Sequence, residues 1–151
     1  ELVGLNLSDL RKKEKTLRLL GKGNKERIIY VNEACLQAME AYEPVRAKIL
    51  SDRHRTNEPA LFLSERGSRI SARRVEQILE KYLAAAGLSG RGYSPHKLRH
   101  TAATLMYQYG GADVRVLKEI LGHENLSTTE IYTHVSSQQI ERAIDSSPVL
   151  R

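Results

Sequence analysis

Residues 94–111 read SPHKLRHTAATLMYQYGG, and this stretch sets the fold class of the chain. Ser94 is a favourable helix N-cap, and Pro95 suits the first helical position, where its missing N–H is not needed. Apolar side chains then recur at helical spacing until the glycine pair at 110–111. They are Leu98, Ala102, Leu105, Met106 and Tyr109. The stretch therefore predicts an amphipathic helix with a basic first turn.

Similar patterns on both sides predict further helices. They cover residues 33–50, 71–87, 113–121 and 137–145, with a short helix that begins at Ser127 and carries Tyr132. We expect Pro44 to kink or interrupt the first of them. Ser71 is predicted as the N-cap of the helix at 71–87. Gly122 is predicted to end the helix at 113–121.

A β-hairpin is predicted near the start of the chain. Two β-prone runs, Thr16–Leu20 and Arg27–Val31, flank a glycine-rich cationic loop at residues 21–25. The leucines at positions 2, 5, 7 and 10 predict the end of a helix that runs into a turn. The expected fold is mainly α with a small antiparallel β-sheet (α+β), formed as one domain over residues 1–151.

Composition narrows the class of protein. The 151 residues suffice for one domain with a core, and 40% hydrophobic and 28% charged residues indicate a soluble globular protein. No apolar run reaches the roughly 20 residues of a membrane helix, and no signal peptide opens the chain. The single cysteine, Cys35, excludes an internal disulfide. These features predict a cytoplasmic protein without a membrane partner.

The distribution of charge favours double-stranded DNA as the partner. The net charge is +6, from 24 basic and 18 acidic residues. Eight of the basic residues fall between Arg11 and Arg27. Such clustering suits several separate phosphate contacts along a duplex.

His96 and Arg99 form a candidate anion site. Three positions apart, they share one face of the predicted helix, in its first turn, where free N–H groups and the helix dipole favour an anion. A surface arginine beside a capping histidine fits these two residues equally well. His96 and His100 have the spacing of metal ligands, but the glutamate of His-Glu-x-x-His is missing and Arg99 adds a cation, so no metal is predicted.

A second informative stretch is GHENLSTTEIYTH at residues 122–134. A tyrosine shortly after a Leu-Gly-His turn can attack a phosphate if cations surround it. Singly, His123 fits a helix cap, Tyr132 a packing residue and the loop at 21–25 a solvated turn. Their joint occurrence in this order indicates chemistry at a phosphate.

Taken together, these residues resemble the tyrosine recombinase (phage-integrase) family, most closely its Xer-type members, over essentially the whole chain. The matching motifs are ELVGL at residues 1–5, GKGNKER at 21–27, the His-x-x-Arg box, and Leu-Gly-His followed by LSTTEIYTHV at 126–135. The resemblance implies the catalytic-domain fold of DNA breaking-rejoining enzymes. It implies no cofactor.

The resemblance also assigns roles. Tyr132 would be the nucleophile of strand cleavage to a 3′-phosphotyrosine, followed by rejoining without ATP or metal. Lys22 would protonate the leaving 5′ oxygen, and Arg99 would hold the phosphate. His96 and His123 would position it, and Glu1 matches the acidic residue that supports the first histidine of the site.

The family pattern extends upstream of this chain. An arginine stands three residues before the position of Glu1, and a separate N-terminal core-binding domain clamps the DNA. Without them, residues 1–151 are expected to be an impaired or inactive, monomeric catalytic fragment. Family members act as synaptic tetramers, and residues 137–145 could dock into a neighbouring protomer or fold back on their own domain.

DNA contacts are expected outside the catalytic set. The helix that Ser71 begins presents three candidates for the major groove, and two more would reach the DNA backbone near the cleavage site. They are Arg73, Arg74 and Gln77 for the groove, and Lys25 and Arg27 for the backbone. The alternative for the helix is a charged, solvated face.

Two other functions fit parts of this pattern. A type IB topoisomerase uses a similar pocket and the same covalent chemistry. A non-catalytic helix-turn-helix module could be formed by residues 113–121 and the helix of Tyr132. The second of those helices, however, offers no Arg, Lys, Asn or Gln to read bases.

Overall fold

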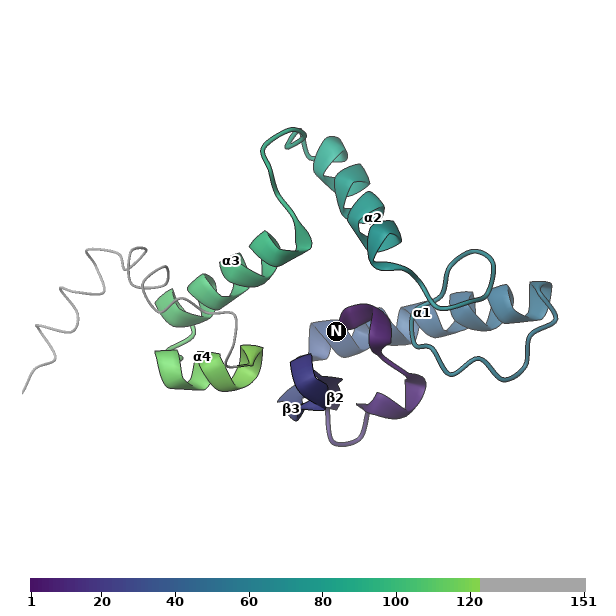
Figure 1. Cartoon of the computed structure of the whole chain (residues 1–151), viewed down its shortest axis with the longest axis horizontal. Coiled ribbons are helices and arrows are strands. Elements are labelled where there is room, and N and C mark those ends of the chain that lie inside the picture. The colour runs from purple at the N-terminus through teal and green to yellow at the C-terminus, as the bar shows by residue number, and fades with distance from the viewer. Residues whose placement is uncertain (123–151) are drawn as a thin grey trace, which may run out of the picture. The chain divides into compact units, whose positions relative to one another are not determined.

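The computed structural model describes residues 1–122, and the chain divides into two units that are described separately. Unit 1 spans residues 1–91 and unit 2 begins at Gly92 (Figure 1). The described residues form four α-helices and one small antiparallel sheet, which confirms the predicted fold class. None of the described helices has the length and hydrophobicity of a transmembrane span.

The sheet of unit 1 has three strands in the order β1-β2-β3. They are Leu10–Arg11, Thr16–Leu20 and Glu26–Tyr30, and β2 pairs antiparallel with β3. The hairpin prediction is confirmed. Strand β1 was missed, because two residues are too few to show an alternating pattern.

The opening segment forms two 3₁₀ helices, η1 (Leu2–Gly4) and η2 (Leu7–Asp9), where the end of a helix was expected. Between η1 and η2, the backbone of residues 5–7 forms hydrogen bonds with residues 59–61. The Leu5 carbonyl accepts the N–H of Leu61 (2.9 Å), and Asn6 forms an isolated bridge with Ala60. These long-range bonds keep the segment from continuing as a regular helix.

The hydrophobic core of unit 1 joins the opening segment, the hairpin, the first helix and the segment after residue 59. Its buried members are Leu5, Leu17, Leu19, Val31, Leu36 and Leu61. Leu61 and Leu63 are buried, and Phe62 is partly buried against the core. Cys35 is partly buried against this core.

The first helix, α1, runs without interruption from Glu33 to Asp52 and contains Pro44. Pro44 was expected to kink or interrupt this helix; the interruption does not occur, and the kink stays a prediction. Proline removes one backbone hydrogen bond from a helix interior. Anchors on both sides hold the helix together, since Leu36 before Pro44 and Arg46 after it are both buried.

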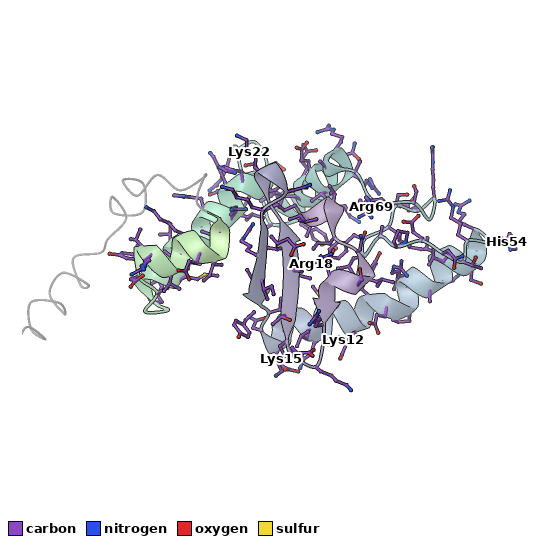
Figure 2. All side chains as sticks on the ribbon, turned by 60° about the horizontal axis from the view of Figure 1, so that its bottom comes forward. Lys12, Lys15, Arg18, Lys22, His54 and Arg69 are labelled. Carbon is purple, nitrogen blue, oxygen red and sulfur yellow. The ribbon has the colours of Figure 1, made fainter. Side chains whose placement is uncertain are left out.

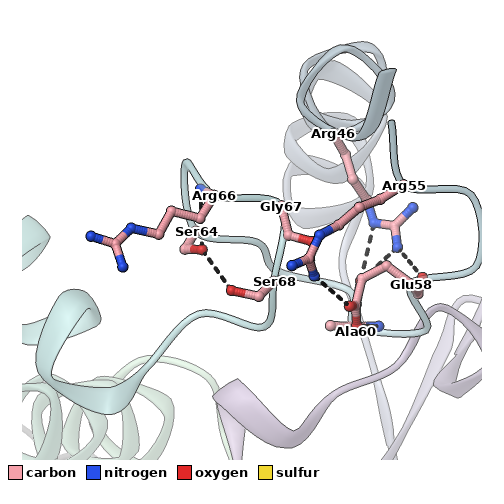
Figure 3. Close-up of polar contacts among 8 residues, drawn as sticks. All are labelled: Arg46, Arg55, Glu58, Ala60, Ser64, Arg66, Gly67 and Ser68. Atoms are coloured by element: carbon pink, nitrogen blue, oxygen red, sulfur yellow. Dashed lines mark hydrogen bonds and ion pairs between the residues drawn. The ribbon is translucent and has the colours of Figure 1, made fainter. Parts of the chain in front are cut away.

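Arg46 is a buried cation whose guanidinium binds backbone carbonyls. Its side chain reaches from α1 to the segment before Leu61, and the residue is 8% exposed. Its Nε and Nη2 donate to the Ala60 carbonyl (3.0 and 2.8 Å), and Nη2 also donates to that of Glu58 (2.6 Å) (Figure 3). Arg46 thereby fastens the segment that pairs with Leu5 and Leu7.

Arg46→Ala is expected to lower the free energy of unfolding substantially. A buried carbonyl left without a donor costs about 1–3 kcal/mol, and the substitution removes the Arg46 donors from the buried Ala60 carbonyl and from the partly buried Glu58 carbonyl. Urea denaturation of residues 1–151 measures the change. Lys48→Ala is the matched control, because Lys48 lies on the same helix with an exposed side chain paired to Asp52. The control should change stability by less than about 0.5 kcal/mol, and equal effects would contradict the role of Arg46.

Asp9 is a buried carboxylate at the end of η2, directly before β1. It accepts the backbone N–H of Asn6 (2.9 Å) and the Nε of Arg18 (2.8 Å). Burial acts to raise the pKa of Asp9, but the Asn6 and Arg18 hydrogen bonds and the charges of Arg18 and Arg69 outweigh it. The pKa of Asp9 is thus lowered.

This lowered pKa predicts a stability that depends on pH. The stabilisation is fully present above the ordinary aspartate pKa of about 3.9 and is lost as the pH falls through the lower, folded-state pKa. Asp9→Asn should therefore destabilise the chain by about 1–3 kcal/mol at pH 7, and by less near pH 3. Urea titrations at both pH values test this, with Asp52→Asn as an exposed control. A deficit that is the same at both pH values would contradict the assignment.

The last helix of unit 1, α2, runs from Ala72 to Ala85. Ser71 caps it as predicted, since its side chain accepts the N–H of Arg74 (3.1 Å). The chain leaves the helix through Gly87, whose φ of +71° is the left-handed conformation that glycine adopts readily.

The described part of unit 2 contains helices α3 (Pro95–Gln108) and α4 (Val114–Leu121). Ser94 accepts the N–H of Lys97 (3.2 Å), and Asp113 accepts that of Val116 (2.9 Å), so both predicted helix starts are confirmed. The buried residue of α3 is Ala103, and the buried residue of α4 is Leu117. All five members of the predicted stripe are exposed in the described part of unit 2, namely Leu98, Ala102, Leu105, Met106 and Tyr109.

Candidate active site

Lys22 lies at the tip of the hairpin, in the short 3₁₀ helix η3 (Lys22–Asn24) between β2 and β3. The loop is closed by a hydrogen bond from the Gly21 N–H to the Lys25 carbonyl (2.8 Å). Gly23 (φ +72°) lets the backbone turn tightly at this point. Lys22 and Lys25 are thus presented on a closed loop at one end of the sheet.

The basic run from Arg11 to Arg27 is not one continuous patch. Lys12 and Lys15 lie at the opposite end of the hairpin from Lys22 (Figure 2). There Lys12 pairs with Glu43, and Lys15 pairs with Glu33 at 3.0 Å. Folding therefore separates lysines that pair with carboxylates of α1 from those carried by the η3 loop.

Glu1 and Arg27 form a two-point ion pair beside this loop. Arg27 Nη1 donates to Glu1 Oε1 (2.6 Å) and Nη2 donates to Oε2 (3.1 Å). A Cβ at Gly21 would lie 3.3 Å from Glu1 Oε1 and 3.4 Å from Arg27 Nη1, so the loop base packs closely against the pair. The sequence did not reveal this contact, because the two residues are 26 positions apart and belong to no shared periodic element.

The Arg27 side chain is 16% exposed and directed at Glu1 in this structure. Its predicted contact with the DNA backbone stays a prediction. Arg27 also has a structural role, because its ion pair joins the start of β3 to the first residue of the chain.

His96 and Arg99 lie one turn apart near the start of α3, as the sequence predicted. His96 is exposed and Arg99 is partly buried. A guanidinium nitrogen of Arg99 donates to the backbone carbonyl of Leu121, the last residue of α4. Carbonyls in the last turn of a helix lack intrahelical donors and attract cations, so this contact satisfies one of them.

The Arg99 contact brings the His-x-x-Arg helix to the Leu-Gly-His turn. Gly122 follows Leu121 with φ +81°, and the chain turns there toward His123. His123 and Tyr132 themselves lie outside the described residues, as do the predicted helices at 127–132 and 137–145. In unit 2 the structure thus joins Arg99 to the residue two positions before His123.

The arginines proposed for DNA recognition on α2 are exposed and accompanied by acidic groups. Arg73 lies 3.4 Å from Glu76 and 3.7 Å from Glu80. Arg74 lies 3.3 Å from Glu65 and 3.4 Å from the Gln77 side chain. These exposed pairs are weak and can exchange for phosphate, so the groove contacts remain a prediction.

The predicted catalytic residues are divided between the two units. Glu1 and Lys22 belong to unit 1, and His96 and Arg99 belong to unit 2. Within residues 1–122, no three His, Cys, Asp or Glu side chains gather in a way that could hold a metal ion. Each unit by itself carries residue types suited to this chemistry: the lysine of unit 1 can transfer a proton, and the arginine and histidine of unit 2 can bind a phosphate.

Comparison with known proteins decides the family. Residues 1–139 match the model of the phage integrase family. The chain belongs to the phage integrase family. This membership is consistent with the catalytic-domain fold that the motifs predicted.

Relatives of this integrase-family chain are tyrosine recombinases. It is 50% identical to "Tyrosine recombinase XerC" of Caldanaerobacter subterraneus subsp. tengcongensis over 99% of the chain and 40% of that protein. It is 43% identical to "Tyrosine recombinase XerC" of Thermodesulfovibrio yellowstonii over 97% of the chain and 48% of that protein. The chain thus spans less than half the length of these curated relatives.

Solved structures of the same kind share the fold. The crystal structure of XerA recombinase matches with a TM-score of 0.76 and 32% identity, over 96% of this chain and 51% of that one. XerH site-specific recombinase bound to palindromic difH substrate, in a post-cleavage complex, matches with a TM-score of 0.67 and 29% identity. That match covers 95% of this integrase-family chain and 40% of XerH.

Proposed function

We propose that the chain is the catalytic part of a site-specific DNA recombinase. Tyr132 attacks a phosphodiester of one DNA strand, which forms a bond from the tyrosine oxygen to phosphorus and breaks the bond from phosphorus to the 5′ oxygen. The products are a 3′-phosphotyrosine and a free 5′ hydroxyl. The attack of another 5′ hydroxyl reverses the step, so rejoining needs no ATP.

The observation that carries this proposal is the contact between Arg99 and the Leu121 carbonyl. It holds the phosphate-binding helix against the turn that leads into His123 and the nucleophile segment. The phage integrase match over residues 1–139 supports it, because the match includes Tyr132. Arg99 and the two histidines, His96 and His123, then bind the scissile phosphate.

The charges of this set favour the reaction. A free tyrosine has a pKa near 10, so only about 0.1% is phenolate at neutral pH. Cations around the phosphate favour the phenolate and stabilise the negative charge of the transition state. Lys22, on its closed loop, donates the proton that the leaving 5′ oxygen requires, and Glu1 supports the histidine side of the site.

The partner in this proposal is duplex DNA in the cytoplasm. XerH is described as bound to difH substrate, which is the kind of ligand the basic residues of this chain suit. Lys25 and Arg27 contact the backbone near the cleavage site, and the groove is read from α2 by Arg73, Arg74 and Gln77. The chain forms the C-terminal catalytic domain of a longer protein with an upstream arginine and a DNA-clamping domain, and four protomers assemble on two duplexes.

A covalent trapping experiment tests the proposal. The full-length protein is incubated with its nicked suicide substrate, in which the strand end is lost by diffusion after cleavage. A protein–DNA adduct that survives SDS is expected. No adduct on any cognate site would contradict strand cleavage, and the helix-turn-helix alternative would then account for DNA binding. Relaxation of supercoiled DNA without exchange between two sites would favour a topoisomerase.

A further inference from the structure

Arg69, labelled in Figure 2, binds the opening segment of the chain through hydrogen bonds. Its Nη1 donates to the carbonyls of Val3 (2.9 Å) and Leu5 (3.0 Å), and its Nη2 donates to the Asn6 side chain. An arginine of a basic protein is an ordinary candidate for a phosphate contact. Because all three acceptors belong to the opening segment, this guanidinium instead holds that segment in place.

The segment that Arg69 holds is the one that carries Glu1. Helix η1 is closed by hydrogen bonds from the Gly4 N–H to the Glu1 carbonyl (3.1 Å) and from the Leu5 N–H to the Leu2 carbonyl (3.2 Å). A displacement of Val3 or Leu5 therefore moves Glu1 with it. Arg69 is part of a short, hydrogen-bonded path to the first residue of the chain.

From Glu1 the path continues to the lysine loop. The Glu1 carboxylate holds the Arg27 guanidinium at two points, and Gly21 packs against both groups. Lys22 is the next residue along the chain and the first of η3. The position of Lys22 is thus linked through Gly21, Glu1 and η1 to Arg69, which lies 47 positions later in the sequence.

We propose that Arg69 is a positioning residue for Lys22, holding the opening segment so that Glu1 and Arg27 support the loop that delivers the general acid. This inference rests on the proposed function, because it assumes that Lys22 protonates the leaving 5′ oxygen. Arg69 touches neither the DNA nor the reacting atoms in this role. Its loss should therefore impair proton donation while leaving the phosphate contacts of Arg99 in place.

The substrate can separate this role from general damage. In a 5′-bridging phosphorothiolate, sulfur replaces the leaving oxygen. Attack by Tyr132 then breaks the phosphorus–sulfur bond and releases a thiolate, whose pKa of about 8.5 removes the need for a proton donor. A variant that lacks only proton donation should recover on this substrate, whereas a misfolded or weakly binding variant should not.

The experiment compares single-turnover cleavage of both substrates by the full-length protein. Lys22→Ala sets the benchmark, with a loss of about 10²- to 10⁴-fold on the oxygen substrate and recovery on the sulfur substrate. Arg69→Gln should lose about 10- to 100-fold on oxygen and recover on sulfur to within about threefold of the parent protein. DNA affinity should change no more than in the control.

Arg66→Gln is the matched control. Arg66 lies in the same loop and carries the same charge, but it is exposed, and Figure 3 shows its side chain extending away from the Arg46 and Arg55 contacts. Gly21→Ala tests the other end of the path, since its Cβ would press on Glu1 and Arg27. It should show the same dependence on the leaving group as Arg69→Gln.

Two results would overturn the inference: Arg69→Gln equal to Arg66→Gln on the oxygen substrate, or a loss that is equally large on both substrates. If Arg69→Gln does not fold, Arg69→Lys, which keeps the charge, is judged by the same comparison. Failure of the parent protein to form any adduct would instead refute the proposed function. Failure of Lys22→Ala to recover on sulfur would refute the assignment of the general acid.

Discussion

Replacement of Tyr132 by phenylalanine is expected to abolish the covalent protein–DNA adduct while DNA binding is kept. The substitution removes one oxygen, which is the atom proposed to attack the phosphate, and leaves the ring and its packing. Loss of a covalent nucleophile lowers the rate by about 10⁴-fold or more. The measurement is adduct formation by the full-length protein on a nicked suicide substrate, with affinity measured separately by fluorescence anisotropy.

Tyr109→Phe is the control for this experiment. Tyr109 follows α3 and is 81% exposed, so loss of its hydroxyl should leave cleavage within about twofold of the parent rate. An adduct that persists in Tyr132→Phe would contradict the nucleophile assignment. If both tyrosine variants lose the adduct, the loss is not specific to Tyr132, and the result counts against a special role for its hydroxyl.

The second large effect is expected at Arg99. Arg99→Ala removes a guanidinium that can hold two phosphate oxygens, and loss of such a preorganised donor costs about 10²- to 10³-fold in rate. It also removes the hydrogen bond to the Leu121 carbonyl, which ties α3 to the turn before His123. Arg99→Lys should recover only part of the activity, because an ammonium is a point charge and lacks the two-pronged geometry.

Single-turnover cleavage at saturating protein measures the Arg99 effect without a contribution from weaker binding. Arg115→Ala is the control, since Arg115 is an exposed arginine on α4 in the same unit. It should change cleavage by less than about threefold. Full activity of Arg99→Lys would contradict a two-oxygen clamp, and equal losses in both alanine variants would indicate a requirement for charge alone.

Local features of the chain were predictable. Ser71, Ser94 and Asp113 are helix N-caps in the structure, because a cap depends only on the next three residues. The hairpin followed from two short β-prone runs and the glycines between them. Of the two effects expected at Pro44, a kink or an interruption, the interruption does not occur, because residues on both sides of the proline are anchored by tertiary packing.

The residues of the candidate site could be predicted from the sequence, but their tertiary contacts could not. The His-x-x-Arg spacing placed His96 and Arg99 on one helix, since helical periodicity is local. Nothing in that spacing indicated that Arg99 would reach the end of α4. The charge of Arg27 likewise suggested DNA, whereas its partner in the structure is Glu1.

The sequence by itself determined the family, the starts of three described helices and the identity of the residues proposed to act on a phosphate, because motif spacing and capping are properties of short segments. Only the tertiary structure decided which arginines bind groups of the protein itself and are therefore not simply available to a phosphate. Arg46 and Arg69 bind backbone carbonyls 12 to 66 positions away in the chain. Whether an arginine binds a phosphate or a carbonyl depends on which distant backbone groups the fold brings near it, and the composition of the chain does not show that.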